Sequence, residues 1–481
     1  MPFREIEATQ LSKEQLDILK LPTKGRVIIS GPPGSGKTIL ALIRLNKIDQ
    51  ELKSDSTGLV MYNRMVRMET IQAARHLKLR NASSRPTGYA EWMASALSHM
   101  FGEKITRDQL FEPGAKAIGK PNWSLIKKMI NERTLIEDSK RWVVVDEGQD
   151  FPREFYEFLY EYWPNVTIFA DDNQSIGSDG STIKSISQHL ARSVHMTVST
   201  NFRNTKETAA FAEHLNTKGI GGSPGKTPES TPRGNKPEMF QVETDRDLAA
   251  NFCRRVIADL LDRNQQPDHA LLTATETNRR KMFDLVNEEW LKAVDARKPT
   301  AEERGRMAAL VELIQEYVPE RLKRPKIGSP GVFIMTMNAA KGCEFESVTL
   351  NTKGFNERWS GLDQKKMLYV ACTRGRGDLR IGIISTNAEI QLQTPEALRS
   401  IPDTVLTRSW LMAKVQKDFA EQLPDGLGLP AVNDRVRHKL FGLGIVTNVI
   451  TGKPITLEVD FGIKGNRTVT AQSVEVVSHD A

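Results

Sequence analysis

Short apolar runs, each ending in polar residues, alternate with helical stretches along the first part of the chain. The clearest of these runs are Val27–Ile29, Leu59–Met61, Val143–Val145 and Val166–Ala170. A strand covered on both faces reads as a continuous apolar run, whereas a half-exposed strand alternates between apolar and polar residues. The pattern therefore predicts buried parallel strands connected by helices, which is an α/β fold.

A second series of the same kind follows a connection rich in Gly, Pro, Ser and Thr at residues 217–236. The pattern predicts strands over 238–242, 270–275 and 332–335, and helices over 206–215, 245–261 and 365–374. Residues 287–325 also read as helical, because apolar residues recur there at helical spacing. We interpret this stripe as core; it consists of Met307, Leu310, Val311, Ile314 and Val318.

Beyond residue 431 the pattern changes to short strands separated by glycine turns. Strands are expected over 435–438, 444–450, 455–461, 467–470 and 474–477. This spacing predicts a small β-barrel. Its basic and acidic residues are nearly balanced, which favours a protein-contact module over a DNA clamp.

Length and charge limit the possible classes of protein. The 481 residues suffice for roughly two to four domains, and the net charge of +7 favours a polyanionic partner without identifying one. No apolar run approaches a membrane span, and Met1–Glu5 lacks a signal-peptide core, so we expect a cytoplasmic protein with no membrane partner. Three scattered cysteines, Cys253, Cys343 and Cys372, suit a reducing compartment.

A glycine-rich loop joins the first apolar run to a helix-like run that begins at Ile39. Strand, glycine loop and helix together are the context in which a P-loop holds phosphates, through backbone N–H groups and the helix N-terminus. Lys37 is expected to reach the β- and γ-phosphates, and the Thr38 hydroxyl to hold Mg²⁺. The flanking strand and helix disfavour the alternative, a turn with an accidental Lys-Thr pair. The loop residues are Gly31, Pro32, Pro33, Gly34, Ser35, Gly36, Lys37 and Thr38.

Two carboxylates directly follow the strand expected over 142–145. With a P-loop upstream, Asp146 is the expected partner of Mg²⁺, and Glu147 is a candidate to orient the attacking water. A solvated acidic turn is the alternative. Gln174 follows the next strand, where it either senses a γ-phosphate or belongs to a plain polar turn.

Further polar residues stand at strand ends, where ligand-contacting groups gather in open α/β sheets. They are Tyr62, Asn63 and Arg64, with a weaker case at Thr87–Tyr89. Gln15 is spaced from Ser12 as in a capping box, although its amide, which both donates and accepts, could instead read an adenine. Arg203 by itself has the pattern of a solvated surface charge.

Taken in order, these stretches resemble the motifs of superfamily 1 helicases of the UvrD/PcrA/Rep kind. The resemblance covers Leu11 to about Arg380. The P-loop is similar to motif I, residues 62–64 to motif Ia, 146–150 to motif II, 171–174 to motif III, 201–203 to motif IV, 336–345 to motif V and 369–374 to motif VI.

This resemblance implies that ATP and Mg²⁺ bind between two lobes. Gln15 would read the adenine and Phe202 would stack on it, while Glu344, beside Gly342, would take the ribose. Arg203 and Arg374 would contact the γ-phosphate from the second lobe, and Gln174 would sense it from the first. The residues implied to contact DNA are Tyr62, Asn63, Arg64, Thr87, Tyr89, Thr336 and Asn338.

The implied fold class is α/β, with two RecA-like parallel-sheet lobes, short helical insertions and a small C-terminal β-barrel. The first lobe would span 1–200, with an insertion at about 91–140. The second would span 201–383, with an insertion at about 287–325. A linker over 384–430 would lead to a Tudor-like barrel over 431–481.

Departures from the family pattern bear on function. The motif III-like stretch continues as Ile176–Gly180, without the aromatic run that stacks on a base, so stacking would come from Tyr62 or Tyr89. Asn338 stands where motif V usually has a histidine, and the insertions are short. We therefore expect an ATP-dependent 3′→5′ motor on single-stranded or tailed DNA, with translocation favoured over processive unwinding.

Two other functions stay open. One is a DNA-sensing ATPase subunit of a nuclease, repair or anti-phage defence complex, with little unwinding of its own. The other is a non-catalytic protein that binds a polymerase, nuclease or repair factor through its C-terminal barrel. The intact carboxylates Asp146 and Glu147 argue against the second alternative.

Overall fold

A computed structural model divides the chain into two compact units, Met1–Thr407 and Arg408–Ala481. The described residues are 11–52, 57–62, 67, 70–71, 74, 86–110, 121–136, 141–175, 180–216, 227–229, 231–262, 268–309, 314–316, 331–386, 389–409, 435–438, 442–450, 456–460, 466–470 and 474–476.

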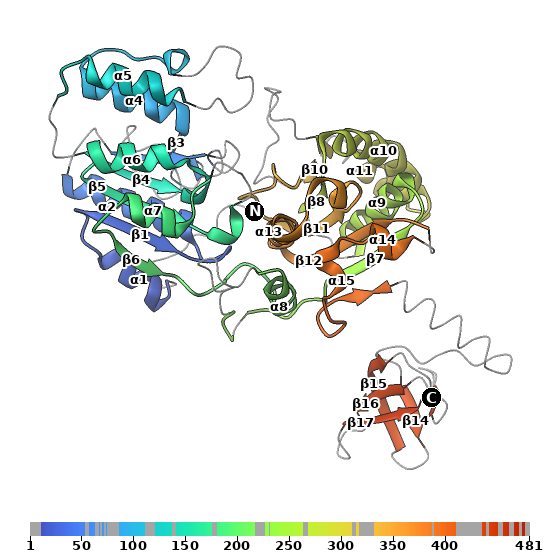
Figure 1. Cartoon of the computed structure of the whole chain (residues 1–481). Coiled ribbons are helices and arrows are strands. Elements are labelled where there is room, and N and C mark those ends of the chain that lie inside the picture. The colour runs from blue at the N-terminus through green and yellow to red at the C-terminus, as the bar shows by residue number, and fades with distance from the viewer. Residues whose placement is uncertain are drawn as a thin grey trace. The chain divides into compact units, whose positions relative to one another are not determined.

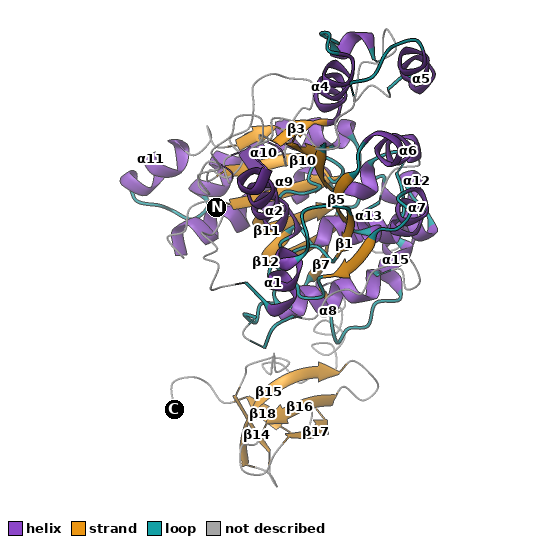
Figure 2. Cartoon of the chain, turned by 90° about the vertical axis from the view of Figure 1, so that its left-hand side faces the viewer, coloured by secondary structure: helices purple, strands orange, loops and turns teal. Residues whose placement is uncertain are grey.

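The first unit contains two sheets, each with helices around it (Figures 1 and 2). The six-stranded sheet of the first lobe has the order β3-β2-β4-β5-β1-β6, and every pair in it is parallel. Because β5 lies between β1 and β4, the loops that follow these three strands meet at one edge. The strands are β1 (Arg26–Ser30), β2 (Thr57–Met61), β3 (Pro86–Gly88), β4 (Trp142–Asp146), β5 (Asn165–Ala170) and β6 (Val194–Thr197).

Both faces of this sheet are buried, which explains the continuous apolar runs. Successive strand residues point to opposite faces. Val143 and Val145 therefore belong to one core cluster, and Val144 to another. The Val144 cluster includes residues of α1 (Lys13–Lys20) and α2 (Lys37–Leu52). The Val143 cluster includes residues of α4 (Tyr89–Phe101), α5 (Trp123–Asn131), α6 (Arg153–Tyr162) and α7 (Ile183–His189).

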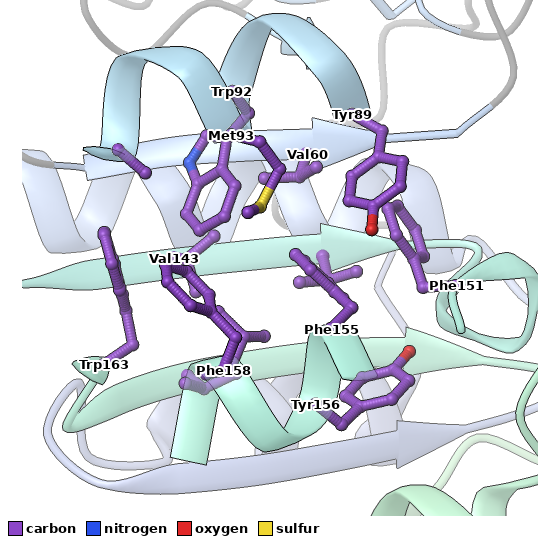
Figure 3. Packing of buried hydrophobic residues seen from close by; sticks show 14 of the residues in the cluster. Val60, Tyr89, Trp92, Met93, Val143, Phe151, Phe155, Tyr156, Phe158 and Trp163 are labelled. Atoms are coloured by element: carbon purple, nitrogen blue, oxygen red, sulfur yellow. The ribbon is translucent and has the colours of Figure 1, made fainter. Parts of the chain in front are cut away.

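Aromatic rings pack between α4, α6 and the strands beneath them (Figure 3). The ring of Tyr89 on α4 lies 5.1 Å from that of Phe151, which lies 4.7 Å from that of Phe155 on α6. Trp92 contacts both Phe155 and Trp163. The helical insertion expected at about 91–140 thus consists, in its described part, of α4, α5 and the short turn η3 (Arg107–Gln109).

The second lobe has a seven-stranded sheet with the order β13-β7-β12-β11-β8-β10-β9. From β7 to β9 its neighbours pair in parallel. Helices α9 and α10 pack on each other and share a core with this sheet. Two parallel sheets flanked by helices make the first unit a pair of RecA-like lobes. The strands are β7 (Glu238–Val242), β8 (Asp268–Thr273), β9 (Ile314–Glu316), β10 (Gly331–Thr336), β11 (Phe345–Asn351), β12 (Gly375–Ile384) and β13 (Thr407–Arg408).

Of the longer helices of the second lobe, α8 and α9 match the predicted ranges, whereas α10 begins well before the predicted residue 287 and α13 begins four residues before its predicted start. The longer helices are α8 (Lys206–Leu215), α9 (Asp245–Asp262), α10 (Glu276–Asp295), α11 (Ala301–Ala309) and α13 (Gly361–Cys372). Short helices α12 (Phe355–Arg358), α14 (Ile390–Gln393) and α15 (Glu396–Arg399) accompany them.

The helical prediction over 287–325 is wrong at residues 314–316, which form a strand. Helix α11 ends at Ala309, and β9 then pairs in parallel with β10. The edge of β10 offers free backbone hydrogen-bonding groups, and pairing with it buries Ile314 as a strand residue. Met307 is core, as predicted. Leu310, Val311 and Val318 lie outside the described residues.

The linker expected over 384–430 also needs correction, because its first part belongs to the first compact unit. Leu398, Ile401 and Leu406 are buried there, and Thr407 N donates to Pro237 O at 2.9 Å. The sequence gives no periodic signal for these contacts, because Leu398 lies on a helix of only four residues and Ile401 and Leu406 follow it outside any helix.

The second unit contains a five-stranded antiparallel sheet with the order β17-β16-β15-β14-β18. All five predicted strands are present: β14 (Arg435–His438), β15 (Gly442–Ile450), β16 (Thr456–Asp460), β17 (Asn466–Thr470) and β18 (Val474–Val476). Alternating residues such as Val436, Val446, Leu457, Val459 and Val469 are buried, as expected for strands with one core face.

Candidate active site

The glycine-rich loop between β1 and α2 curls around the Lys37 side chain. Gly34 and Gly36 have φ angles of +77° and +81°, which glycine adopts without strain. Lys37 is only 7% exposed, and its Nζ donates to the carbonyl oxygens of Gly31 (2.6 Å) and Pro32 (2.9 Å). The loop therefore holds a buried cation among backbone carbonyl groups.

Two features of the loop fit an oxyanion ligand. The Ser35 hydroxyl is buried and has no hydrogen-bond partner among the described residues. The carboxylate of Asp171, the nearest anion to Lys37, lies 3.9 Å from its Nζ, beyond hydrogen-bond distance. A phosphate group would give the Ser35 hydroxyl an acceptor and Lys37 an anion within hydrogen-bond distance.

Thr38 and Asp146 meet at the ends of α2 and β4. The Thr38 hydroxyl donates to Oδ2 of Asp146 at 2.7 Å. Burial, followed by repulsion from Glu147, raises the pKa of Asp146 to about 7. A bound dication would favour the charged form of this carboxylate, and a hydroxyl with a carboxylate suits Mg²⁺, which often takes few protein ligands. Among the described residues no group of three or more His, Cys, Asp or Glu side chains could hold a metal.

Glu147 follows Asp146 in a left-handed backbone conformation, with φ of 53°. Such a conformation is uncommon outside glycine and turns the side chain sharply at the strand end. Burial alone would raise the pKa of Glu147, but Lys341 and Lys37 outweigh that effect and hold the pKa below its ordinary value. Glu147 is therefore an ionised, buried carboxylate, suited to act as a base.

A chain of amide hydrogen bonds links Glu147 to the second lobe. Gln149 donates to Glu147 through Nε2 and accepts from the Asp171 backbone N–H (2.9 Å). The Asp171 carboxylate accepts from Gln174 Nε2 at 2.8 Å. Gln174 Oε1 in turn accepts from Nη2 of Arg374 at 3.2 Å. The network therefore crosses from the first lobe to the second.

Arg374 is a fully buried cation surrounded by neutral acceptors. Its guanidinium donates to the carbonyls of Val370 (2.8 Å) and Cys343 (3.4 Å) and to the Thr373 hydroxyl (3.1 Å), besides Gln174. Burial, followed by repulsion from Arg203, lowers the pKa of Arg374 to about 10, so it stays charged at neutral pH. An anionic ligand beside it would relieve the cost of burying this charge.

Arg203 reaches the same region from the segment between the lobes. It forms an ion pair with Glu344, and its Nε is buried without a hydrogen-bond partner among the described residues. Phe202 beside it is 45% exposed, and its backbone N–H donates to Gly34 O at 3.0 Å. Gly342 precedes Glu344 in a left-handed conformation, with φ of 83°. These residues lie near the P-loop or near Arg374, as the motif order suggested.

Gln15 caps α1, and its amide also bonds to the P-loop. Its Oε1 accepts from Ser12 N at 2.9 Å and its own N–H donates to Ser12 Oγ, which completes the capping box. At the same time its Nε2 donates to Ser35 O at 3.0 Å. The cap therefore points this amide at the P-loop.

The residues expected to contact DNA fall into two groups. Thr336 ends β10, and Asn338 is exposed in the turn that follows it. Tyr62 is partly exposed at the end of β2, and Thr87 donates to Leu59 O within the sheet. Asn63 and Arg64 lie outside the described residues.

Tyr89 does not suit base stacking in this structure. Its ring is 6% exposed and packs between Tyr62, Phe151 and Phe155. The aromatic core of the first lobe therefore uses the ring faces that a base would need. Of the two tyrosines, only Tyr62 retains exposed surface.

Sequence reasoning missed three functional candidates. Lys341 of the second lobe forms a buried ion pair with Asp150 of the first. Gln149 orients Glu147, and Asn204 bonds to the backbone on both sides of Arg374. Lys341 lies inside the motif V-like stretch and Gln149 inside the motif II-like stretch, and these positions are the signal that could have identified them. Nothing in the sequence pointed to Asn204.

No helix among the described residues is long and apolar enough to cross a bilayer. No family model matches the chain, and no curated protein matches it. Among solved structures, it is similar to the C-terminal domain of a possible DNA helicase from Lactobacillus plantarum WCFS1, with 15% identity, a TM-score of 0.28, and coverage of 43% of this chain and 98% of that one. It is also similar to Arterivirus nonstructural protein 10 (helicase), with 13% identity, a TM-score of 0.33, and coverage of 78% of this chain and 63% of that one.

Proposed function

We propose that the chain is an ATP-driven motor that moves 3′→5′ along single-stranded DNA, like the UvrD/PcrA/Rep helicases whose motifs it resembles. One observation carries the proposal. The hydrogen bond between Arg374 of the second lobe and Gln174 of the first brings a second-lobe cation into the network that holds Glu147. The polarity comes from the motif resemblance.

First-lobe residues activate the attacking water and form the metal site. Lys37 would exchange its loop carbonyls for phosphate oxygens, and Thr38 and Asp146 would hold Mg²⁺, which would neutralise phosphate charge. Glu147 orients the attacking water and accepts its proton, a role worth about 10²–10⁴ in rate. Gln149 keeps the Glu147 carboxylate in place.

Second-lobe residues stabilise the charge that develops on the transferred phosphoryl group. Arg374 is already desolvated, and Arg203 exchanges Glu344 for a phosphate oxygen, which frees Glu344 for the ribose. Arginines in this role contribute about 10³–10⁵ in rate. Because Arg374 comes from the second lobe, closing the lobes and hydrolysing ATP become coupled events. Gln15 and the exposed face of Phe202 hold the adenine.

The DNA strand is proposed to cross the carboxyl ends of the second-lobe strands. Thr336 ends β10, and the exposed Asn338 lies in the turn that follows it. Hydroxyl and amide groups at a shared edge suit contacts with phosphate and sugar. Tyr62 offers a ring for a base at the corresponding edge of the first lobe.

A DNA-sensing ATPase with little unwinding of its own is the second candidate. It is favoured by the small size of the helical additions, which in the described residues consist of α4, η3 and α5 in one lobe and α11 in the other. In either case we assign the protein to the cytoplasm and propose that the second unit docks a protein partner.

The deciding experiment measures ATP turnover with and without single-stranded DNA, together with strand displacement on 3′-tailed and 5′-tailed duplexes. Stimulated turnover with displacement of the 3′-tailed duplex alone supports the motor. Stimulated turnover without displacement supports the DNA-sensing ATPase. A chain that hydrolyses no ATP under either condition refutes both.

A further inference from the structure

Asn204 is a buried side chain that touches the backbone on both sides of Arg374. Its exposure is 1%, and its Nδ2 donates to the carbonyls of Gly375 (2.6 Å) and Thr373 (3.3 Å). An asparagine amide nitrogen carries two N–H donors, so these two bonds use both of them. The turn that carries Arg374, between α13 and β12, is thus fixed by a side chain from another segment.

A second asparagine fixes Asn204 in turn. Asn201 donates from Nδ2 to Oδ1 of Asn204 at 3.0 Å. Oδ1 of Asn201 accepts the backbone N–H groups of Arg203 (3.0 Å) and Asn204 (3.3 Å). This amide pair therefore orders the turn that presents Arg203 and, through Asn204, the turn that presents Arg374.

The same turn packs directly on the P-loop. Phe202 N donates to Gly34 O at 3.0 Å. A Cβ added at Gly34 would lie 2.5 Å from both Arg203 Cβ and Asn201 Oδ1, so the two backbones are in close contact. Asn201 therefore links the loop proposed to hold phosphate with both arginines proposed to act on it.

We propose that Asn204 is a positioning residue that sets Arg374 against the phosphate site and acts on hydrolysis only through that arginine. This inference rests on the proposed ATPase function and adds to it a residue that contacts neither nucleotide nor metal. Misplacing a catalytic group by about 1 Å can cost on the order of 10²-fold in rate. Asn204→Ser removes one of the two donors and shortens the side chain, so Arg374 loses its backbone anchor while the P-loop stays intact.

The test is a double-mutant cycle on the full-length chain, with kcat and KM for ATP measured for wild type, Asn204→Ser, Arg374→Ala and the double variant. We expect Asn204→Ser to lower kcat by about 10–100-fold with KM within about threefold. In the Arg374→Ala background, Asn204→Ser should lower kcat by less than about twofold, because the guanidinium that Asn204 positions is no longer present.

A matched control separates this role from general loss of packing. Asn165 is likewise buried and bridges two backbone segments, accepting from Gly25 N (2.9 Å) and donating to Arg141 O (3.2 Å). It begins β5, at the opposite end of that strand from Asp171. Asn165→Ser should lower the thermal midpoint and leave kcat within about twofold.

A second variant tests the same role in case Asn204→Ser does not fold. Asn201→Asp keeps the acceptor for two backbone N–H groups but loses the donor to Asn204, and it should show the same dependence on Arg374. The positioning role is overturned if the losses of kcat are additive in both double-mutant cycles, or if Asn165→Ser lowers kcat as much as Asn204→Ser does. Either result leaves the ATPase proposal in place. An inactive wild-type chain instead refutes the ATPase proposal and this inference together.

Discussion

Lys341 of the second lobe and Asp150 of the first form an ion pair in which both side chains are largely buried. Asp150 ends the turn that begins at Glu147, and its backbone N–H donates to Glu147 O at 2.9 Å. Burial raises the pKa of Asp150 to about 6 even though Lys341 opposes that rise. The two lobes are therefore joined by a charge pair attached to the turn that carries Glu147.

Removing the cation from this pair should cost both stability and rate. Lys341→Met leaves Asp150 buried without its cation, so the free energy of unfolding in urea should fall by about 3 kcal/mol, and turnover by about tenfold. The control is Lys281→Met. Lys281 is half exposed in its ion pair with Asp245, so this change should lower the free energy of unfolding by less than about 1 kcal/mol. Adding Asp150→Asn to Lys341→Met should recover most of the lost stability, and a double variant as unstable as the single one would contradict the argument.

Substitutions of Lys37 and Glu147 should separate ATP binding from ATP hydrolysis. Lys37→Ala should abolish ATP turnover because it removes the cation of the P-loop. Glu147→Gln should abolish turnover but retain ATP binding, since the amide keeps the shape of the carboxylate without its basicity. Equilibrium binding of a fluorescent ATP analogue alongside steady-state turnover distinguishes the two, with Glu154→Gln on α6 as the control. Normal turnover in both variants would refute the site assignment.

Gly34 should tolerate no side chain. Its φ of +77° costs an alanine about 1–2 kcal/mol, and the added Cβ would lie 2.5 Å from Arg203 Cβ and Asn201 Oδ1. Gly34→Ala should therefore weaken nucleotide binding and lower the thermal midpoint. Gly305→Ala is the opposite case, because Gly305 lies within α11 with nothing within 4 Å of its added Cβ, and it should stabilise the chain by about 0.5–1 kcal/mol. Equal effects of the two changes would contradict the close packing of the loop.

Asp245 gives the second lobe a measurable pH dependence. Burial opposes ionisation, but hydrogen bonds from Lys281 (2.5 Å) and Lys353 (2.7 Å) outweigh it and hold the pKa of Asp245 below its ordinary value. A carboxyl with a lowered pKa contributes stability above its unfolded-state pKa and loses that contribution as the pH falls through the folded-state pKa. Asp245→Asn should therefore destabilise the chain by about 1 kcal/mol at pH 7 and progressively less below about pH 4. A difference that persists unchanged at pH 3 would count against the charge pair.

DNA binding should depend steeply on salt. Each phosphate contacted on a single strand contributes a slope of about −0.7 to a plot of log affinity against log salt concentration. Fluorescence anisotropy of a labelled oligonucleotide at several salt concentrations gives this slope. Binding that does not change with salt would argue against a backbone-tracking motor.

The P-loop and seven strands of the two lobes were predictable because they depend on local pattern, whereas β3, β6, β9, β11, β12 and β13 were not predicted. Burial of both sheet faces gives the apolar runs, and Asp146 and Glu147 stand where the chain leaves the sheet at the end of β4. Gln15 was recognisable as a cap from its spacing to Ser12, but its second bond, to Ser35 O, depends on how α1 packs beside the P-loop.

Other features depend on contacts between distant segments, which no local pattern encodes. Lys341 and Asp150 are 191 residues apart in sequence. The edge of β10 recruits Ile314 into a strand despite its helical spacing. Tyr89 follows a strand end in a loop-like sequence, yet the aromatic residues of α6 draw its ring into the core.

The aromatic cluster beneath α4 also limits how the first lobe can change during evolution. Phe151 directly follows Asp150 and packs against Tyr89, while Tyr156 donates its hydroxyl to Gly148 O within the catalytic turn. Helix α4 is thus packed on the turn that carries Glu147. A larger insertion in its place would require new partners for these rings, because without them the backbone of that turn would shift.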